Sequence, residues 1–113
     1  MIVVVGQVLV QLDRLEEALA LSLDHVRRSR AESGCISHAV HHDVENPLCL
    51  VFVERWADQA ALAQHFAEPA SGAFVRAMAA LAAEAPSIAI YRASALPAPD
   101  LGRSAGPASE GDE

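Results

Sequence analysis

The chain has 113 residues, of which 52% are apolar and 20% are charged, and its formal net charge is -7 at pH 7. This length and composition predict one domain with a core of its own. The acidic surface disfavours nucleic acid and membrane partners, because both carry negative charge. All the basic residues are arginines, which excludes mechanisms that need a lysine, such as Schiff-base chemistry or P-loop phosphate binding.

The start of the chain and its cysteines indicate a cytoplasmic protein. The apolar run from Ile2 to Val5 is too short for a signal peptide or a membrane span, and no basic segment precedes it. Cys35 and Cys49 lack metal-ligand spacing, and the strand register predicted below places them too far apart for a disulfide. We therefore expect two buried thiols in a reducing compartment.

The first predicted elements are a strand, a helix and a hairpin. Residues 2–12 are rich in β-branched side chains and predict a strand buried on both faces. Asp13 and Glu16 have the spacing of a helix N-cap and its capping-box partner, so a helix is predicted over residues 14–32. Strand-like runs over residues 35–42 and 48–56 flank a loop of Asp, Asn and Pro, which predicts a hairpin.

The hairpin register decides which side chains share a face. We expect His42 to pair with Leu48, which places His38 opposite Phe52. One face of the sheet then carries the larger side chains Ile36, His38, Phe52, Glu54 and Trp56, joined by Val3, Val5 and Leu9. The other face carries the smaller side chains Cys35, Ser37, Ala39, Val51 and Val53, which suit a covering helix. The first face is too apolar to stay in water and is expected to meet the sheet of a second copy.

The second half of the chain repeats the helix and strand order. Asp58 is an N-cap candidate for a helix that Pro69 must interrupt, and a further helical segment follows to residue 82. Residues 87–96 predict the last strand. Residues 97–113 are acidic and rich in Pro, Gly, Ser and Ala, so we expect a mobile tail after a domain of residues 1–96.

The order strand, helix, strand, strand, helix, strand is that of the ferredoxin-like split βαβ fold. This is an α+β architecture in which helices pack on one face of a four-stranded antiparallel sheet. Pairing of two sheets face to face would make a homodimer.

Several short motifs resemble the antibiotic biosynthesis monooxygenase domain: Glu32-Ser33-Gly34-Cys35, Asn46-Pro47, Glu54-Arg55-Trp56 and the downstream His65. The resemblance spans residues 2–96 and implies a dimeric α+β barrel that oxidises quinols or anthrones without a cofactor. It also implies that Trp56 and Arg76 occupy substrate-site positions. Relatives in the wider group degrade haem or isomerise a sugar, but Val75 stands where the haem-degrading branch has its iron-ligating histidine. Haem degradation is therefore not expected.

The candidate site residues also have structural interpretations. His65 is either a general base projecting between sheet and helices, or a half-buried residue at a helix end. Trp56 and Phe52 pack in the core or an interface, form an aromatic wall for a planar substrate, or do both. Glu54 on an apolar face must be paired, protonated or wet, so an ion pair with an arginine of a partner chain competes with catalysis. His38 is a candidate polar contact to substrate.

The remaining histidines do not predict a metal site. His41 and His42 are neighbours on a strand and point to opposite faces, while His38 and His42 are too far apart for one ion. His25, near the end of the first helix, fits a placement against the helix dipole. No metal or cofactor is expected.

The predicted function is oxidation of a hydroquinone or polyphenol by molecular oxygen. His65 is the expected base, Trp56 and Phe52 the wall, and His38, Glu54 or Arg76 the polar anchors. Two alternatives share the fold: an isomerase acting on a small polar metabolite, and a dimeric binding module without catalysis.

Overall fold

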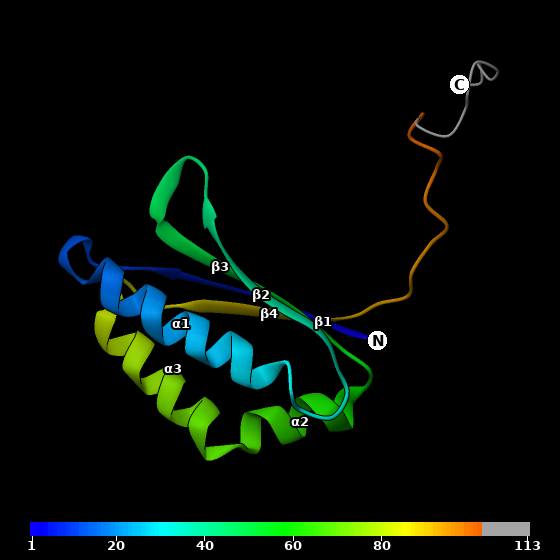
Figure 1. The fold of residues 1–113 in the computed structure, drawn as a ribbon, viewed down its shortest axis with the longest axis horizontal. Coiled ribbons are helices and arrows are strands. Elements are labelled where there is room, and N and C mark those ends of the chain that lie inside the picture. The colour runs from blue at the N-terminus through cyan, green and yellow to red at the C-terminus, as the bar shows by residue number, and fades with distance from the viewer. Residues whose placement is uncertain (103–113) are drawn as a thin grey trace.

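A computed structural model describes residues 1–102 of the chain. Strands and helices follow one another in the predicted order, and the second helical region is split in two (Figure 1). The strands are β1 (Ile2–Leu9), β2 (Cys35–Asp43), β3 (Asn46–Trp56) and β4 (Ser87–Arg92). The helices are α1 (Leu15–Ser29), α2 (Gln59–Ala67) and α3 (Pro69–Leu81), and a 3-10 turn, Leu12–Arg14, precedes α1.

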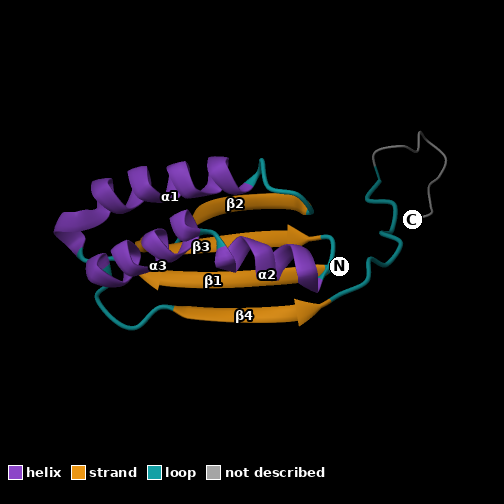
Figure 2. Cartoon of the chain, turned by 90° about the horizontal axis from the view of Figure 1, so that it is seen from below, coloured by secondary structure: helices purple, strands orange, loops and turns teal. Residues whose placement is uncertain are grey.

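The strands form one antiparallel sheet in the order β2-β3-β1-β4, and the helices lie along one of its faces (Figure 2). The predicted α+β ferredoxin-like fold is therefore confirmed. Successive side chains of a strand point to opposite faces, so Val4 and Val8 are buried under the helices while Gln7 is exposed. The core between the two layers includes the fully buried Leu50 and Trp56.

The prediction of which sheet face the helices cover was wrong. We expected Phe52 and Trp56 to face a second copy of the chain, but both are buried against the chain's own helices. The small residues that make room for these rings lie on α1 and not on the sheet: Ala18, Ser22 and Ser29. The open face of the sheet carries the half-buried side chains Val3, Val5, Leu9, Ser37, Ala39, Val51 and Val53.

The hairpin register also differs from the prediction. His38 pairs with Glu54 and not with Phe52, and an irregularity at Ile36 separates the pair of Cys35 with Trp56 from the next pair along β2. This bulge leaves Ile36 half exposed and turns Cys35 onto the covered face, where it packs beside Trp56. Because the register moves by an even number of residues, His38 keeps its predicted face and gains Glu54 as its direct neighbour.

One of the two predicted helix caps is confirmed. The Asp58 carboxylate accepts a hydrogen bond from the Ala61 amide at 2.9 Å and begins α2. The prediction for Asp13 was wrong, since this residue lies in the 3-10 turn and the cap position of α1 is Arg14, whose side chain makes no capping hydrogen bond. The amide of Gln11, the residue before the 3-10 turn, donates to the Leu81 carbonyl at 3.0 Å. This hydrogen bond links the end of the first strand segment to the end of α3.

Only Glu68 separates α2 from α3. Pro69 is the first residue of α3, where its missing N–H costs no helical hydrogen bond. The Glu68 amide donates to the His65 carbonyl at 3.2 Å, and the Glu68 carbonyl accepts from the Ser71 amide at 2.9 Å. A single residue thus joins the turn that carries His65 to the first turn of α3.

The last strand ends at Arg92, earlier than the predicted residue 96. Residues 93–102 form no helix or strand. Of the predicted tail, residues 97–102 are exposed, and residues 103–113 lie outside the described part of the chain. No helix within residues 1–102 has the length and apolar character needed to cross a membrane.

Candidate functional site

A cavity of about 350 Å³ lies between the sheet and helices α2 and α3. Phe52, Phe74 and Met78 contribute to its largely apolar wall. His25 and His65 add imidazole groups to this wall, as Glu54 adds a carboxylate. The cavity therefore combines space for an apolar ligand with a few polar groups, as small-molecule sites usually do.

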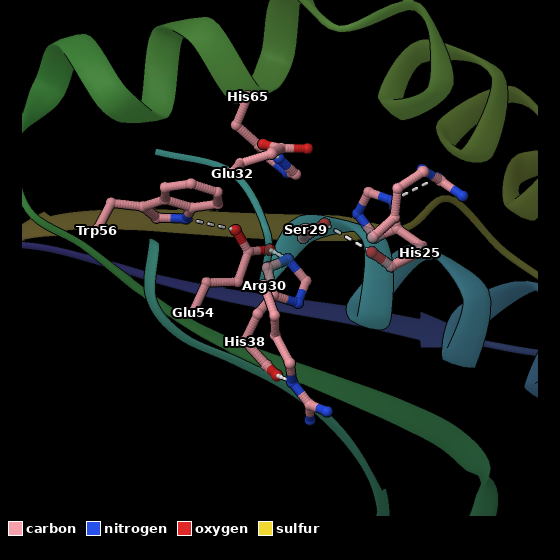
Figure 3. Close-up of polar contacts among 9 residues, drawn as sticks. His25, Ser29, Arg30, Glu32, His38, Glu54, Trp56 and His65 are labelled. Carbon is pink, nitrogen blue, oxygen red and sulfur yellow. Dashed lines mark hydrogen bonds and ion pairs between the residues drawn. The ribbon is translucent and has the colours of Figure 1, made fainter. Parts of the chain in front are cut away.

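Four buried titratable side chains meet beside this cavity, each from a different element (Figure 3). His25 comes from α1, His38 from β2, Glu54 from β3 and His65 from α2. The centroids of the imidazole rings are 5.3 Å apart for His25 and His38, 5.4 Å for His25 and His65, and 5.6 Å for His38 and His65. The fold thus gathers three histidines that are distant in sequence.

Glu32, in the turn before β2, orients His65. The Nδ1 atom of His65 lies 2.7 Å from Oε1 of Glu32. An ionised carboxylate only accepts hydrogen bonds, so Nδ1 carries the hydrogen and donates it. In the neutral ring, Nε2 is then the atom with the lone pair, and it is available to accept a proton or to ligate a metal.

Trp56 holds both Glu54 and His65 in place. Its indole Nε1 donates to Oε1 of Glu54 at 2.9 Å, and its ring centroid lies 4.5 Å from that of His65. Burial by itself would raise the pKa of Glu54, but the contacts with His38 and the indole outweigh burial and hold this pKa below its usual value. Glu54 is therefore a buried anion at neutral pH.

His38 is fully buried and poorly satisfied. Its Nε2 lies 3.4 Å from Oε2 of Glu54, within ion-pair range. Among the described residues, however, neither ring nitrogen makes a hydrogen bond of good geometry. A buried polar group without partners costs free energy, and such groups occur mostly where a ligand, ion or water completes them.

His25 is a component of the site that the sequence analysis missed. The prediction of a placement against the helix dipole was wrong, because the ring is buried and stacks on Phe74 with centroids 3.9 Å apart. Arg28 Nη2 lies 3.2 Å from His25 Nδ1, and since a guanidinium only donates, Nδ1 accepts and Nε2 carries the hydrogen. Burial, followed by the nearby His38 and His65, lowers the pKa of His25 to about 3.

The predicted site residues divide into three groups. His65, Glu54 and Phe52 line the cavity. Trp56 and His38 are fully buried behind them and are not part of the cavity wall. Arg76 lies on the exposed side of α3, and the fold does not bring it to the others. A sequence signal for His25 did exist, because positions 18, 22, 25 and 29 follow one helical stripe that is otherwise made of small residues.

Comparison with known proteins identifies the family. The family model described as antibiotic biosynthesis monooxygenase matches residues 1–77. The chain belongs to this family. The matched segment runs from β1 into α3 and contains every polar side chain of the cluster. The family resemblance inferred from the sequence motifs is therefore confirmed.

Relatives of this antibiotic biosynthesis monooxygenase family member include solved structures. One, described as an antibiotic biosynthesis monooxygenase, is 25% identical with a TM-score of 0.78, and the alignment covers 84% of this chain and 100% of that chain. A conserved protein from Methanosarcina mazei Go1 is 27% identical with a TM-score of 0.79, over 82% of this chain and 92% of that chain.

A curated relative, the uncharacterized protein sll1783 of Synechocystis sp., is 38% identical over 91 residues. That alignment covers 80% of this chain and 62% of the relative. The present chain therefore spans less than two thirds of that protein's length.

Proposed function

We propose that this protein is a monooxygenase that oxidises an electron-rich aromatic, of the hydroquinone or polyphenol class, with molecular oxygen. The observation that carries the proposal is the His65–Glu32 pair at the wall of a largely apolar cavity. A carboxylate that holds one imidazole nitrogen as a donor makes the other nitrogen an oriented base. Family membership supports an oxidation as the reaction in which this base acts.

Proton removal starts the proposed reaction. Nε2 of His65 accepts the proton of a phenolic hydroxyl, and Glu32 stabilises the imidazolium that forms. The phenolate then reduces molecular oxygen, one oxygen atom enters the substrate ring and the other leaves as water. One hydroquinone and one molecule of oxygen thus give one hydroxyquinone and one water, and no cofactor takes part. The largely apolar lining of the cavity protects the intermediate from water.

The dimensions of the cavity support a substrate with one or two rings. An apolar cavity of about 150 Å³ accommodates benzene, and this cavity is more than twice as large. His25 presents an Nε2–H group that is suited to hydrogen bond a phenolic or quinone oxygen, because Arg28 holds the opposite nitrogen as the acceptor. Phe52 and Phe74, whose rings are in edge-to-face contact with centroids 5.8 Å apart, together supply aromatic wall.

We also propose that the protein is a homodimer in the cytoplasm. The open face of the sheet carries half-buried apolar side chains on β1 and β3, among them Val5 and Val53, which are direct cross-strand partners. A second copy that covers this face would remove their apolar surface from water. The unpaired thiols of Cys35 and Cys49 support a reducing compartment.

Oxygen consumption by the purified full chain with a panel of hydroquinones tests the proposed function. We expect uptake with a hydroxyquinone as product, and His65→Ala should lower turnover by about two to four orders of magnitude. His42→Ala is the matched control, since His42 is exposed on the hairpin and lies outside the cluster. Its turnover should equal that of the unmodified protein.

Three outcomes would overturn the proposal. Full oxygen uptake by His65→Ala removes the assigned base. Hydrogen peroxide as the sole product of oxygen reduction identifies an oxidase in place of a monooxygenase. Thermal stabilisation by hydroquinones without oxygen uptake favours the alternatives, an isomerase or a binding module.

A further inference from the structure

The proposed base chemistry needs only one imidazole, but three buried imidazoles lie close together. One nitrogen from each of His25, His38 and His65 can be chosen so that all three lie within 4.8 Å of one another. The three rings come from α1, β2 and α2, so three separate elements converge on one point (Figure 3). We propose that His25, His38 and His65 form a binding site for one divalent transition-metal ion, with Glu54 as its carboxylate ligand.

The distances between the three ring nitrogens are close to those between the ligands of a metal ion. Ligand nitrogens about 2.0–2.1 Å from a tetrahedral zinc ion are about 3.4 Å apart, so nitrogens at 4.8 Å need ring movements of only about 1 Å to close around an ion. Oε2 of Glu54 already lies 3.4 Å from Nε2 of His38, the spacing that two ligands of one ion keep. Glu54 is therefore close enough to His38 to supply an oxygen as a fourth ligand.

His38 is the side chain that points most directly to a ligand. It is fully buried, and neither of its ring nitrogens makes a hydrogen bond of good geometry to the described residues. An ion bound between the rings would satisfy one of these nitrogens. Apart from the 3.4 Å approach of Glu54, no described residue partners these nitrogens, and the proposed proton transfer does not use His38.

The surroundings of His65 match those of a metal-bound imidazole. Its Nδ1 donates to Glu32 at 2.7 Å, which leaves Nε2 with the lone pair. Histidine ligands in metalloproteins commonly donate their second nitrogen to a carboxylate in this way, which fixes the ring and makes it a stronger ligand. The charge of Glu54, buried beside the rings, further favours a cation.

His25 must exchange one hydrogen bond to become a ligand. Arg28 donates to its Nδ1, so the hydrogen now lies on Nε2. Binding through Nε2 moves that hydrogen to Nδ1 and releases Arg28, with no net gain or loss of a proton. Arg28 is exposed, so water replaces the lost contact, and one exposed hydrogen bond is weak compared with a metal–imidazole bond.

The nitrogen-rich ligand set selects the class of ion. Imidazole suits zinc and the neighbouring transition ions, whereas magnesium and calcium require oxygen ligands. A bound ion would occupy the lone pair of His65 Nε2, so the metal-bound form and the base form of this histidine exclude one another. The metal site goes beyond the proposed oxidation and does not depend on it.

The test uses the full chain without a histidine tag, freed of metal by a chelator and then dialysed. Calorimetric titration with zinc chloride, and absorption spectroscopy with cobalt chloride, should each show one ion per chain, and magnesium chloride should not bind. Replacement of His25, His38 or His65 by alanine should weaken zinc affinity more than about 100-fold, and Glu32→Gln by about 10- to 100-fold. His42→Ala should bind zinc as the unmodified chain does.

Circular dichroism of the metal-free variants shows whether each variant is folded, so that a loss of zinc affinity is not confused with unfolding. Should one histidine variant fail to fold, the other two and the cobalt spectrum, which reports the coordination geometry of the bound ion, decide the question. Absence of zinc binding at millimolar concentration would overturn the proposal, as would equal affinity of His38→Ala and the unmodified chain. Because these measurements are independent of oxygen uptake, failure of the metal site leaves the proposed oxidation standing, and the reverse also holds.

Discussion

Gly34 lies so close to Ala61 that a Cβ atom on Gly34 would overlap the Cβ of Ala61. Gly34 also has a φ of 83°, a conformation that residues with a side chain rarely adopt. Its carbonyl accepts a hydrogen bond from the Ala57 amide at 2.8 Å. This contact between the turn before β2 and the start of α2 brings Glu32 within reach of His65.

Gly34→Ala should therefore disturb both stability and catalysis. The positive φ and the overlap with Ala61 together should lower the free energy of unfolding by at least about 2 kcal/mol. Urea unfolding measures this change. Gly102→Ala is the control, since Gly102 has a φ of 90° but open space around it, and it should lower the free energy of unfolding less than Gly34→Ala does. Equal effects of the two substitutions would show that the close contact does not matter.

Glu32→Gln tests the orientation of His65. The neutral amide keeps the size of the side chain but stabilises the imidazolium less, so kcat for hydroquinone oxidation should fall about 10- to 100-fold with little change in KM. The change is measured by oxygen uptake. Glu45→Gln, at the exposed hairpin turn, removes the same charge at a distance and should leave kcat unchanged. A normal kcat for Glu32→Gln would contradict the role of this pair.

The metal-free protein should lose stability in mild acid. The pKa of His25 falls from 6.5 to about 3 on folding, so between these values the unfolded chain binds a proton that the folded chain does not. The free energy of unfolding therefore has its full value above about pH 6.5. It declines as the pH falls, by up to about 1.4 kcal/mol per pH unit. The lowered pKa of Glu54 acts in the same direction at lower pH, because its stabilisation is lost as the pH falls through its folded-state pKa.

His25→Phe isolates this effect in urea unfolding at pH 7.5 and pH 5. Between these values the unmodified chain should lose about 1–2 kcal/mol more than the variant, whose phenyl ring still packs on Phe74. His42→Phe, at an exposed position, should keep the full pH dependence. An unchanged pH dependence in His25→Phe would mean that the buried imidazole does not account for the loss.

The open face of the sheet should be the dimer interface. Light scattering of the unmodified chain at micromolar concentration should report twice 11.9 kDa. Val53→Asp places a charge at the centre of this face and should give a folded monomer, because an unpaired charge in an interface is costly. Val44→Asp, at a hairpin position that is 97% exposed, should remain a dimer. A monomeric unmodified chain would contradict the prediction.

Much of the fold could be predicted because its signals are local. Alternation along β1 and β3, the Asp58 cap and Pro69 each act over a few residues, and each places an element where the structure has it. Alternation says that a strand has two faces, but not which one the helices cover. That choice depends on how the residues of α1 pack, and the small stripe of Ala18, Ser22 and Ser29 settles it in favour of the face with Trp56.

The site was only partly predictable for a related reason. Glu54, His38 and Trp56 kept a common face because the register error was even, so their relation to one another survived it. The partnership of Glu32 with His65 spans 33 residues and depends on the turn before β2 closing on α2. His25 was missed because it lies on a helical stripe of small residues, Ala18, Ser22 and Ser29, which gives little apolar signal.

The one-residue joint at Glu68 couples the size of the cavity to the position of His65. Ser71, in the first turn of α3, lines the cavity, and Glu68 bonds both to Ser71 and to the turn that carries His65. A bulky ligand that pushes α3 outward therefore also moves the C-terminal end of α2, because Glu68 is hydrogen-bonded to both helices. Redesign for larger ligands would therefore require a longer connection between α2 and α3 as well as smaller side chains in the cavity wall. The His65 imidazole could then keep its orientation while the cavity becomes larger.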